Sequence, residues 1–171
     1  MKYKGLLFLT AILISVFTLA ASAQSEKEFL DPAGKFKLTL AGDWRAVAYS
    51  DGVGRQKTEF VYRDRSEGLL KITKESLSSS SLGDLVQQEE ESLRIYRSGY
   101  ARAARESFGG GGLTGMRLSF YNNEGARQLA NTYYFLKDGN SVWVLRFTGK
   151  RGSLDSNRNL TDQIARSFSP M

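Results

Sequence analysis

Cysteine and histidine are both absent from the 171 residues. Without histidine the chain cannot build the Ser-His-Asp or Cys-His systems of nucleophilic enzymes, and without either residue it cannot build the usual zinc, iron or copper sites. Disulfides are excluded as well, so packing alone has to stabilise the fold. Any chemistry would have to come from carboxylates, Lys, Arg, Tyr, Ser or Thr.

Positive charge is in modest excess. The formal net charge is +6, and it becomes +4 when the two lysines Lys2 and Lys4 are removed. Such a small and scattered excess does not favour nucleic-acid binding. It is compatible with an acidic protein partner or an anionic lipid surface.

The long apolar run of the chain lies at its start. Lys2 and Lys4 precede the run Leu6–Ala20, and the small residues Ala21–Ala23 follow it. A positive start, an apolar centre and a small-residue end are typical of a secretory signal peptide. We therefore expect residues 1–23 to be a signal peptide. A retained membrane anchor is the alternative, although the run is short for a span of about 20 residues.

Cleavage would leave residues 24–171 as one domain, which is long enough to bury a core without disulfides. No cysteine follows the apolar run, so a lipid anchor at that point is excluded. No later run approaches the length of a membrane span. We expect a protein of the periplasm or the cell exterior that has no transmembrane segment after cleavage.

The stretch FKLTLAGDW, residues 36–44, alternates apolar and polar side chains and then turns at a Gly-Asp pair. This period of two predicts a strand with one buried face. Trp44 opens a second strand, in which it and Ala46 are expected to face inward. The indole is predicted to fill the core, and stacking of Trp44 on a ligand is the alternative.

Further alternating runs are separated by turn-forming residues. Arg65–Gly68, Asn122–Gly125 and Asp138–Asn140 are predicted hairpin turns. The run SVWVLRF is almost wholly apolar, which indicates a central strand buried on both faces. The predicted strands lie at residues 58–64, 68–76, 105–110, 113–121, 127–137 and 141–147.

Two segments have helical spacing. The first is predicted from Leu82 to about Tyr100, with Ser81 and Asp84 as a capping pair. The second is marked by apolar residues at 160, 164 and 168, with Ser153 or Asp155 as its cap. The sum predicts an α+β fold: a three-layer α/β/α sandwich with a central, mainly antiparallel sheet of about six or seven strands and two main helices.

The pattern F-x-L-x-L, a turn and then Trp, at residues 36–44, resembles the PsbP-like family. The helix start Ser81–Leu85, the YYF…GN…VWVLRF hairpin and the closing segment Ile164–Phe168 are similar to it as well. Ala41 stands where the family commonly has proline. The resemblance implies a binding or assembly module rather than an enzyme. Relatives in phototrophs help to retain calcium and chloride at the water-oxidising centre.

Arg94, Arg97, Arg102 and Arg105 form a basic cluster at the end of the predicted helix. An ordinary solvated helix face is the favoured interpretation, and docking of these arginines to an acidic protein surface or to anionic lipid heads is the alternative. The glutamates at 89–91 are typical of a solvated face, because consecutive helix residues cannot converge on one ion. No metal site is predicted.

Glycines at 110, 112 and 115 match the dinucleotide fingerprint formally. A strand rather than a helix is predicted after them, so a hairpin turn is the better interpretation.

These features together predict an exported, non-catalytic binding or assembly module without a cofactor, docking to an unidentified protein or membrane-associated complex. Three alternatives stay open. The chain would be a calcium-linked photosystem II protein if its source is phototrophic. It would be a small-ligand carrier if a cavity lies under Trp44 or Trp143. It would be a carboxylate-based enzyme if ionisable groups converge in a cleft between sheet and helix.

Overall fold

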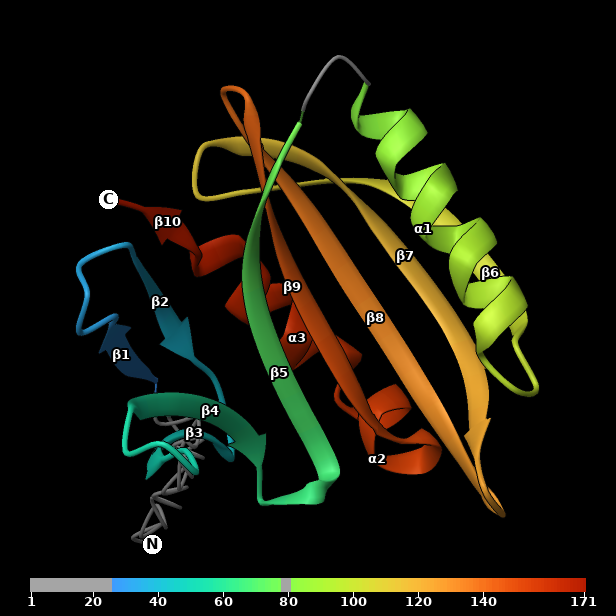
Figure 1. The fold of residues 1–171 in the computed structure, drawn as a ribbon, viewed down its shortest axis with the longest axis horizontal. Coiled ribbons are helices and arrows are strands. Elements are labelled where there is room, and N and C mark those ends of the chain that lie inside the picture. The colour runs from blue at the N-terminus through green and yellow to red at the C-terminus, as the bar shows by residue number, and fades with distance from the viewer. Residues whose placement is uncertain (1–25, 78–80) are drawn as a thin grey trace, which may run out of the picture.

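Seven strands form one antiparallel sheet in the order β3-β4-β5-β9-β8-β7-β6 (Figure 1). The computed structural model describes residues 26–77 and 81–171, so the predicted signal peptide lies outside the described residues. The strands from β6 to β9 form a meander, and its last strand, β9, pairs with β5, which lies earlier in the chain. Their bounds are β3 Trp44–Ser50, β4 Gln56–Tyr62, β5 Asp64–Ser76, β6 Ala101–Gly110, β7 Leu113–Glu124, β8 Arg127–Asp138 and β9 Ser141–Lys150.

A second, three-stranded sheet packs on one face of the first. It consists of β1 (Lys27–Leu30), β2 (Phe36–Leu40) and β10 (Ser169–Pro170), in the order β1-β2-β10. The alternation in residues 36–40 correctly predicted a strand with Phe36, Leu38 and Leu40 buried. It did not predict that this strand would belong to a separate sheet.

The helices lie on opposite faces of the large sheet. Helix α1 (Leu82–Tyr96) packs on β7 and β8, whereas α2 (Arg151–Ser156) and α3 (Arg158–Ser167) lie on the other face with β2 (Figure 1). The buried side chains accordingly form two clusters, one on each face. The predicted three-layer α+β arrangement is confirmed.

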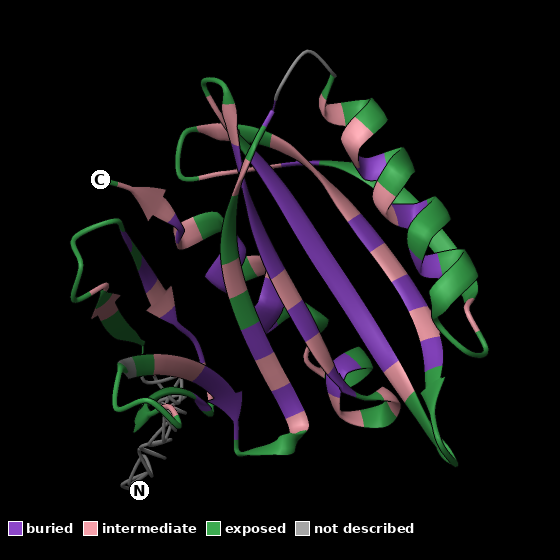
Figure 2. Ribbon diagram, in the orientation of Figure 1, coloured by how far each residue is buried: buried purple, intermediate pink, exposed green. Residues whose placement is uncertain are grey.

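Strands β8 and β9 form the centre of the sheet and are buried on both faces (Figure 2). In β9, Trp143, Leu145 and Phe147 join the cluster under α3, while Val142 and Val144 join the cluster under α1. The nearly continuous apolar run in the sequence follows from this double burial, because each face of the strand meets a different core.

The predicted capping pair of α1 is confirmed. The Ser81 hydroxyl accepts a hydrogen bond from the Asp84 N–H at 3.1 Å, and the Asp84 carboxylate accepts one from the Ser81 N–H at 2.9 Å. The predicted end at Tyr100 is wrong. The helix ends at Tyr96, and the chain then turns at Gly99, whose φ is +64°.

Two other boundaries differ from the prediction. The turn between β4 and β5 lies at Arg63, with a φ of +56°, rather than at residues 65–68, and β5 already begins at Asp64. In the C-terminal region, Ser153 and Asp155 lie inside the additional helix α2 and cap nothing. Helix α3 begins after it and has no side-chain cap.

Candidate functional site

Strands β4 and β5 diverge soon after the turn that joins them. Beyond the turn they pair only at Phe60 with Leu70 and at Val61 with Leu69, next to a register shift between Val61 and Tyr62. Strand β5 nevertheless continues to Ser76 along its other neighbour, β9. From Lys71 onward, β5 therefore has a strand on one side only, within the described part of the chain (Figure 1).

The hairpin of β3 and β4 consequently projects from the body of the sheet. Trp44 is buried at its base, but all the other residues of β3 are exposed. The prediction that Ala46 faces inward is wrong, because no layer of the described part of the chain covers β3 beyond its first residue. Several large apolar side chains are exposed on or near this hairpin: Leu30, Val47, Tyr49 and Val53.

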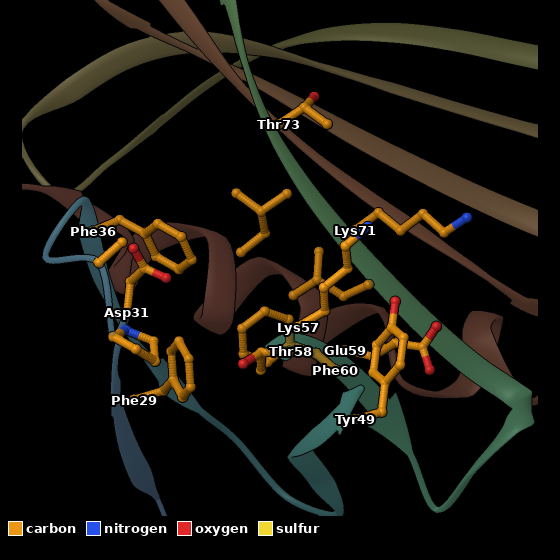
Figure 3. A pocket seen from close by; sticks show the side chains of 14 residues that line it. Phe29, Asp31, Phe36, Tyr49, Lys57, Thr58, Glu59, Phe60, Lys71 and Thr73 are labelled. Carbon is orange, nitrogen blue, oxygen red and sulfur yellow. The ribbon is translucent and has the colours of Figure 1, made fainter. Parts of the chain in front are cut away.

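A cleft of about 550 Å³ opens where the two strands diverge. One side of it is aromatic and comes from three different strands (Figure 3). The Phe29 ring meets the Phe60 ring edge-on at 4.9 Å between centroids, and Phe36 lies 6.1 Å from Phe29. Ile72 of β5 completes this apolar side. The cleft thus offers a hydrophobic surface that a bound molecule would cover.

The opposite side of the cleft is polar, with Tyr49, Glu59 and Lys71 (Figure 3). Glu59 is paired with Arg65 at 2.6 Å. Lys57 also lines the cleft and is paired with Asp51 at 3.3 Å. Glu59 and Lys57 are therefore bound in separate ion pairs rather than directed at one point.

A second hollow of about 610 Å³ continues the cleft along β5. Both hollows are lined by Asp31, Phe36 and Ile72, and the second adds Lys35 and Lys74. Together they form a groove beside β5, which we call the β5 groove. It is lined by four lysines and two acids, namely Lys35, Lys57, Lys71, Lys74, Asp31 and Glu59.

The structure divides the predicted arginine cluster in two. Arg94 and Arg105 both bind Glu90, at 3.1 and 3.0 Å. Glu90 is itself buried, so the interpretation of residues 89–91 as a solvated face is wrong at this position. Sequence periodicity could not predict that Glu90 is a buried ion-pair acceptor. A carboxylate is buried only where cations compensate its charge, and one of the two cations here, Arg105, comes from β6.

Arg97 and Arg102 lie on either side of the turn after α1 and are exposed. Neither takes part in an ion pair with the residues that the structure describes. Ile95 and Tyr96 in the same segment are 73% and 80% exposed. A docking role for the four arginines stays a prediction, with Arg97 and Arg102 as its available members.

Trp44 is 1% exposed and packs between rings of the main core. Its indole meets Phe147 edge-on at 5.2 Å and lies 5.7 Å from Tyr62. Its Nε1 has no hydrogen-bond partner among the described residues. A ligand would reach this indole only if a neighbouring ring moved aside, so the packing role is the one that the contacts support.

A polar cluster joins β7, β8 and α3. Arg117 donates to both carboxylate oxygens of Asp162, at 2.7 and 2.8 Å, and also pairs with Glu106. The Tyr134 hydroxyl donates to Asp162 at 2.6 Å and lies 2.8 Å from the Thr161 hydroxyl. These bonds hold α3 on the sheet, although the buried Arg117 Nε has no hydrogen-bond partner among the described residues. Within residues 26–77 and 81–171, no three acidic side chains gather as metal ligands would.

Alkaline conditions are expected to destabilise the protein through Tyr134. Burial, and secondarily the bond to Asp162, raises the pKa of this phenol, and burial also raises the pKa of Tyr133. The stabilising effect is complete below the unfolded pKa of about 10 and is lost as the pH rises towards the folded pKa. The free energy of unfolding should fall above pH ~10 by up to about 1.4 kcal/mol per pH unit for Tyr134. Urea titrations across this range measure the slope, and an equal slope in Tyr134→Phe would contradict this origin.

No family model matches the chain, and no curated protein sequence matches it. Solved structures do match. The PsbP protein of the cyanobacterium Synechocystis (CyanoP) is 13% identical, with 89% of this chain and 96% of that chain covered and a TM-score of 0.59. The chain has a PsbP-like fold. LpqN of Mycobacterium tuberculosis, involved in cell envelope biogenesis, matches at 11% identity and a TM-score of 0.61, with 87% of this chain and 92% of that chain covered.

The Ran-binding protein Mog1p of Saccharomyces cerevisiae has the same fold, at 12% identity and a TM-score of 0.57 over 86% of this chain and 96% of that one. The structural matches establish the PsbP-like fold. At sequence identities this low, membership of the PsbP-like family stays a prediction. None of the helices in the described ranges is long and apolar enough to cross a membrane.

Proposed function

We propose that this chain is an exported, non-catalytic binding module that holds a segment of a partner protein in the β5 groove. The observation that carries the proposal is the groove itself, in which three phenylalanines from separate strands line one side of a cleft of about 550 Å³. Phe36 and Phe60 are buried and Phe29 is half-buried, so their rings form a recessed apolar lining of the kind that is typical of concave binding sites. Tyr49, which is partly exposed, also lines the cleft.

Two further points favour binding over catalysis. Glu59 and Lys57 in the groove are engaged in ion pairs with residues outside it. In the cluster around Arg117 and Asp162, both Asp162 carboxylate oxygens and the Tyr134 hydroxyl are engaged in hydrogen bonds within the protein. The neighbours of this fold include a Ran-binding protein, which is in keeping with a protein-binding role. Export rests on the predicted signal peptide.

Substitution at the aromatic side of the groove tests this proposal. Short random peptides displayed on phage are selected on the purified protein, and their affinity is measured for Phe29→Ala and Leu30→Ala. Phe29 lines the cleft, whereas its neighbour Leu30 is 60% exposed on the other face of β1. We expect Phe29→Ala to weaken binding by about tenfold or more and Leu30→Ala by less than about twofold. Equal affinity of all three proteins for the selected peptides would show that the groove is not the binding site.

A further inference from the structure

The edge of β5 that lines the groove carries unpaired backbone groups. The Leu77 N–H donates to the Asn140 carbonyl at 2.8 Å, so it points towards β9. The pairing of β5 with β9 runs without a register shift from Leu69 to Ser76. In an antiparallel strand the N–H and C=O of one residue point to the same side, and the side alternates along the chain. The backbone groups of Ile72, Lys74 and Ser76 therefore point away from β9, into the groove.

No strand among the described residues pairs with these three positions. The open edge is about 17 Å long for the six residues from Lys71 to Ser76, at about 3.4 Å per residue. Native proteins usually protect such an edge, often by a lysine directed across it. Lys74 does not do so here, because it folds back over the Trp143 ring and pairs with Asp138 at 3.5 Å. The edge is thus available to another chain.

We propose that the β5 groove takes one extended segment of a partner protein as an additional strand on β5. This inference rests on the proposed function and specifies how the segment is held. Strand addition of this kind derives affinity from main-chain hydrogen bonds and specificity from alternate side chains. The groove has room for a single strand. If a partner added its own intact sheet, a second strand would lie about 4.8 Å beyond the first and would have to fit between the flanks of the groove. Strand β4 and the Asp31–Phe36 turn already occupy the flanks of the groove.

The two faces of the groove define the chemistry of that segment. On the face towards α3, the added strand meets Phe36, Phe60 and Ile72. On the other face it meets Lys71, which is exposed and takes part in no ion pair with the described residues. Lys57 and Glu59 lie there as well, but they are already paired with Asp51 and Arg65. A strand on β5 directs successive side chains to opposite faces. The partner segment therefore alternates apolar and acidic residues.

A synthetic peptide tests the inference directly. The probe is a peptide of about seven residues, blocked at both ends, that alternates valine and glutamate. The control peptide has lysine in place of each glutamate. Fluorescence anisotropy with the purified protein should give an affinity at least about tenfold higher for the acidic probe. Equal affinities, or no binding of the acidic probe at about 1 mM, would overturn the inference.

Backbone methylation of the probe separates strand addition from other binding in the same groove. N-methyl groups on alternate residues remove the donors of one side only. One of the two methylated probes should lose about tenfold or more in affinity, and the other less than about twofold. If peptides selected for Phe29-dependent binding tolerate both methylation patterns, the groove still binds a partner, but strand addition is wrong. If no peptide depends on Phe29, the proposed function fails as well.

Two readouts on the protein complete the design. Amide exchange at Ile72, Lys74 and Ser76 should slow when the acidic probe is bound, while Lys71, Thr73 and Glu75, whose amides face β9, stay unchanged. Ser76→Pro removes one donor of the open edge without breaking the pairing with β9, and Ser76→Ala is its control. Only the proline variant should weaken binding. A concentration-dependent dimer that Ser76→Pro abolishes would instead identify the occupant as β5 of a second copy, and would overturn the inference.

Discussion

Replacing Trp44 with alanine is expected to lower the free energy of unfolding by about 3–5 kcal/mol. The indole is 1% exposed and is enclosed by the Phe147 and Tyr62 rings. Gly68 of β5 lies so close that an added Cβ would be 3.2 Å from the indole. Because these neighbours belong to three strands, they cannot collapse into the space that the substitution leaves. Urea unfolding followed by circular dichroism measures the loss.

Two matched variants make this prediction specific. Trp44→Phe keeps an aromatic ring and removes an indole N–H that has no partner among the described residues, so it should cost only about 1–2 kcal/mol. Tyr96→Ala removes an aromatic side chain that is 80% exposed, and its effect should stay within about 0.5 kcal/mol. A loss below about 1 kcal/mol in Trp44→Ala would mean that the indole is not a core residue, and would revive ligand stacking as its role.

Asp162→Ala is expected to destabilise the protein by about 3 kcal/mol or more. The side chain of Arg117 is 11% exposed, and both of its bonds to Asp162 would be lost. The Tyr134 hydroxyl would lose the same acceptor. A guanidinium left in a nearly buried site retains its desolvation cost, with only the half-exposed Glu106 left to compensate its charge, and this accounts for most of the expected effect.

The control is the simultaneous replacement of both charges. Arg117→Met combined with Asp162→Leu removes the buried cation and its partner together, and it should be closer to wild type than Asp162→Ala alone. If the double variant is the less stable of the two, the ion pair itself stabilises the fold and the desolvation argument is wrong. Denaturant midpoints of the three proteins decide between these outcomes.

Much of the fold could be predicted because its signals are local. The capping pair at Ser81, the alternation in residues 36–40 and the hairpin turn at Asp138–Asn140 each depend on neighbouring residues, and all three are confirmed. The end of α1 was placed too late because Tyr100 continues the helical spacing. In the structure its ring packs on Phe120, at 5.1 Å between centroids, from the turn just before β6 rather than from the helix. A side chain can reach the same core from two different elements, and spacing alone does not distinguish them.

The candidate site could be predicted only in fragments. Phe36 was assigned to a buried face, but nothing in the sequence placed it beside Phe29 and Phe60. The arginine cluster was recognised from its spacing, whereas the acceptor shared by Arg94 and Arg105, the buried Glu90, was not. Both failures have one cause: the contacts join elements that are distant in the chain, and periodicity carries no information on which elements meet.

The sequence by itself determined most of the strands, the helices α1 and α3, and the apolar faces of β2 and β9. Those properties follow from side-chain periods of two and 3.6 residues, which the covalent chain imposes locally. The tertiary structure alone decided that β4 leaves β5 after Leu70 and that β1 and β2 form a sheet of their own. The length over which two strands stay paired depends on their register, their twist and the layer that covers each of them. These three factors are set only when distant segments meet in the folded chain.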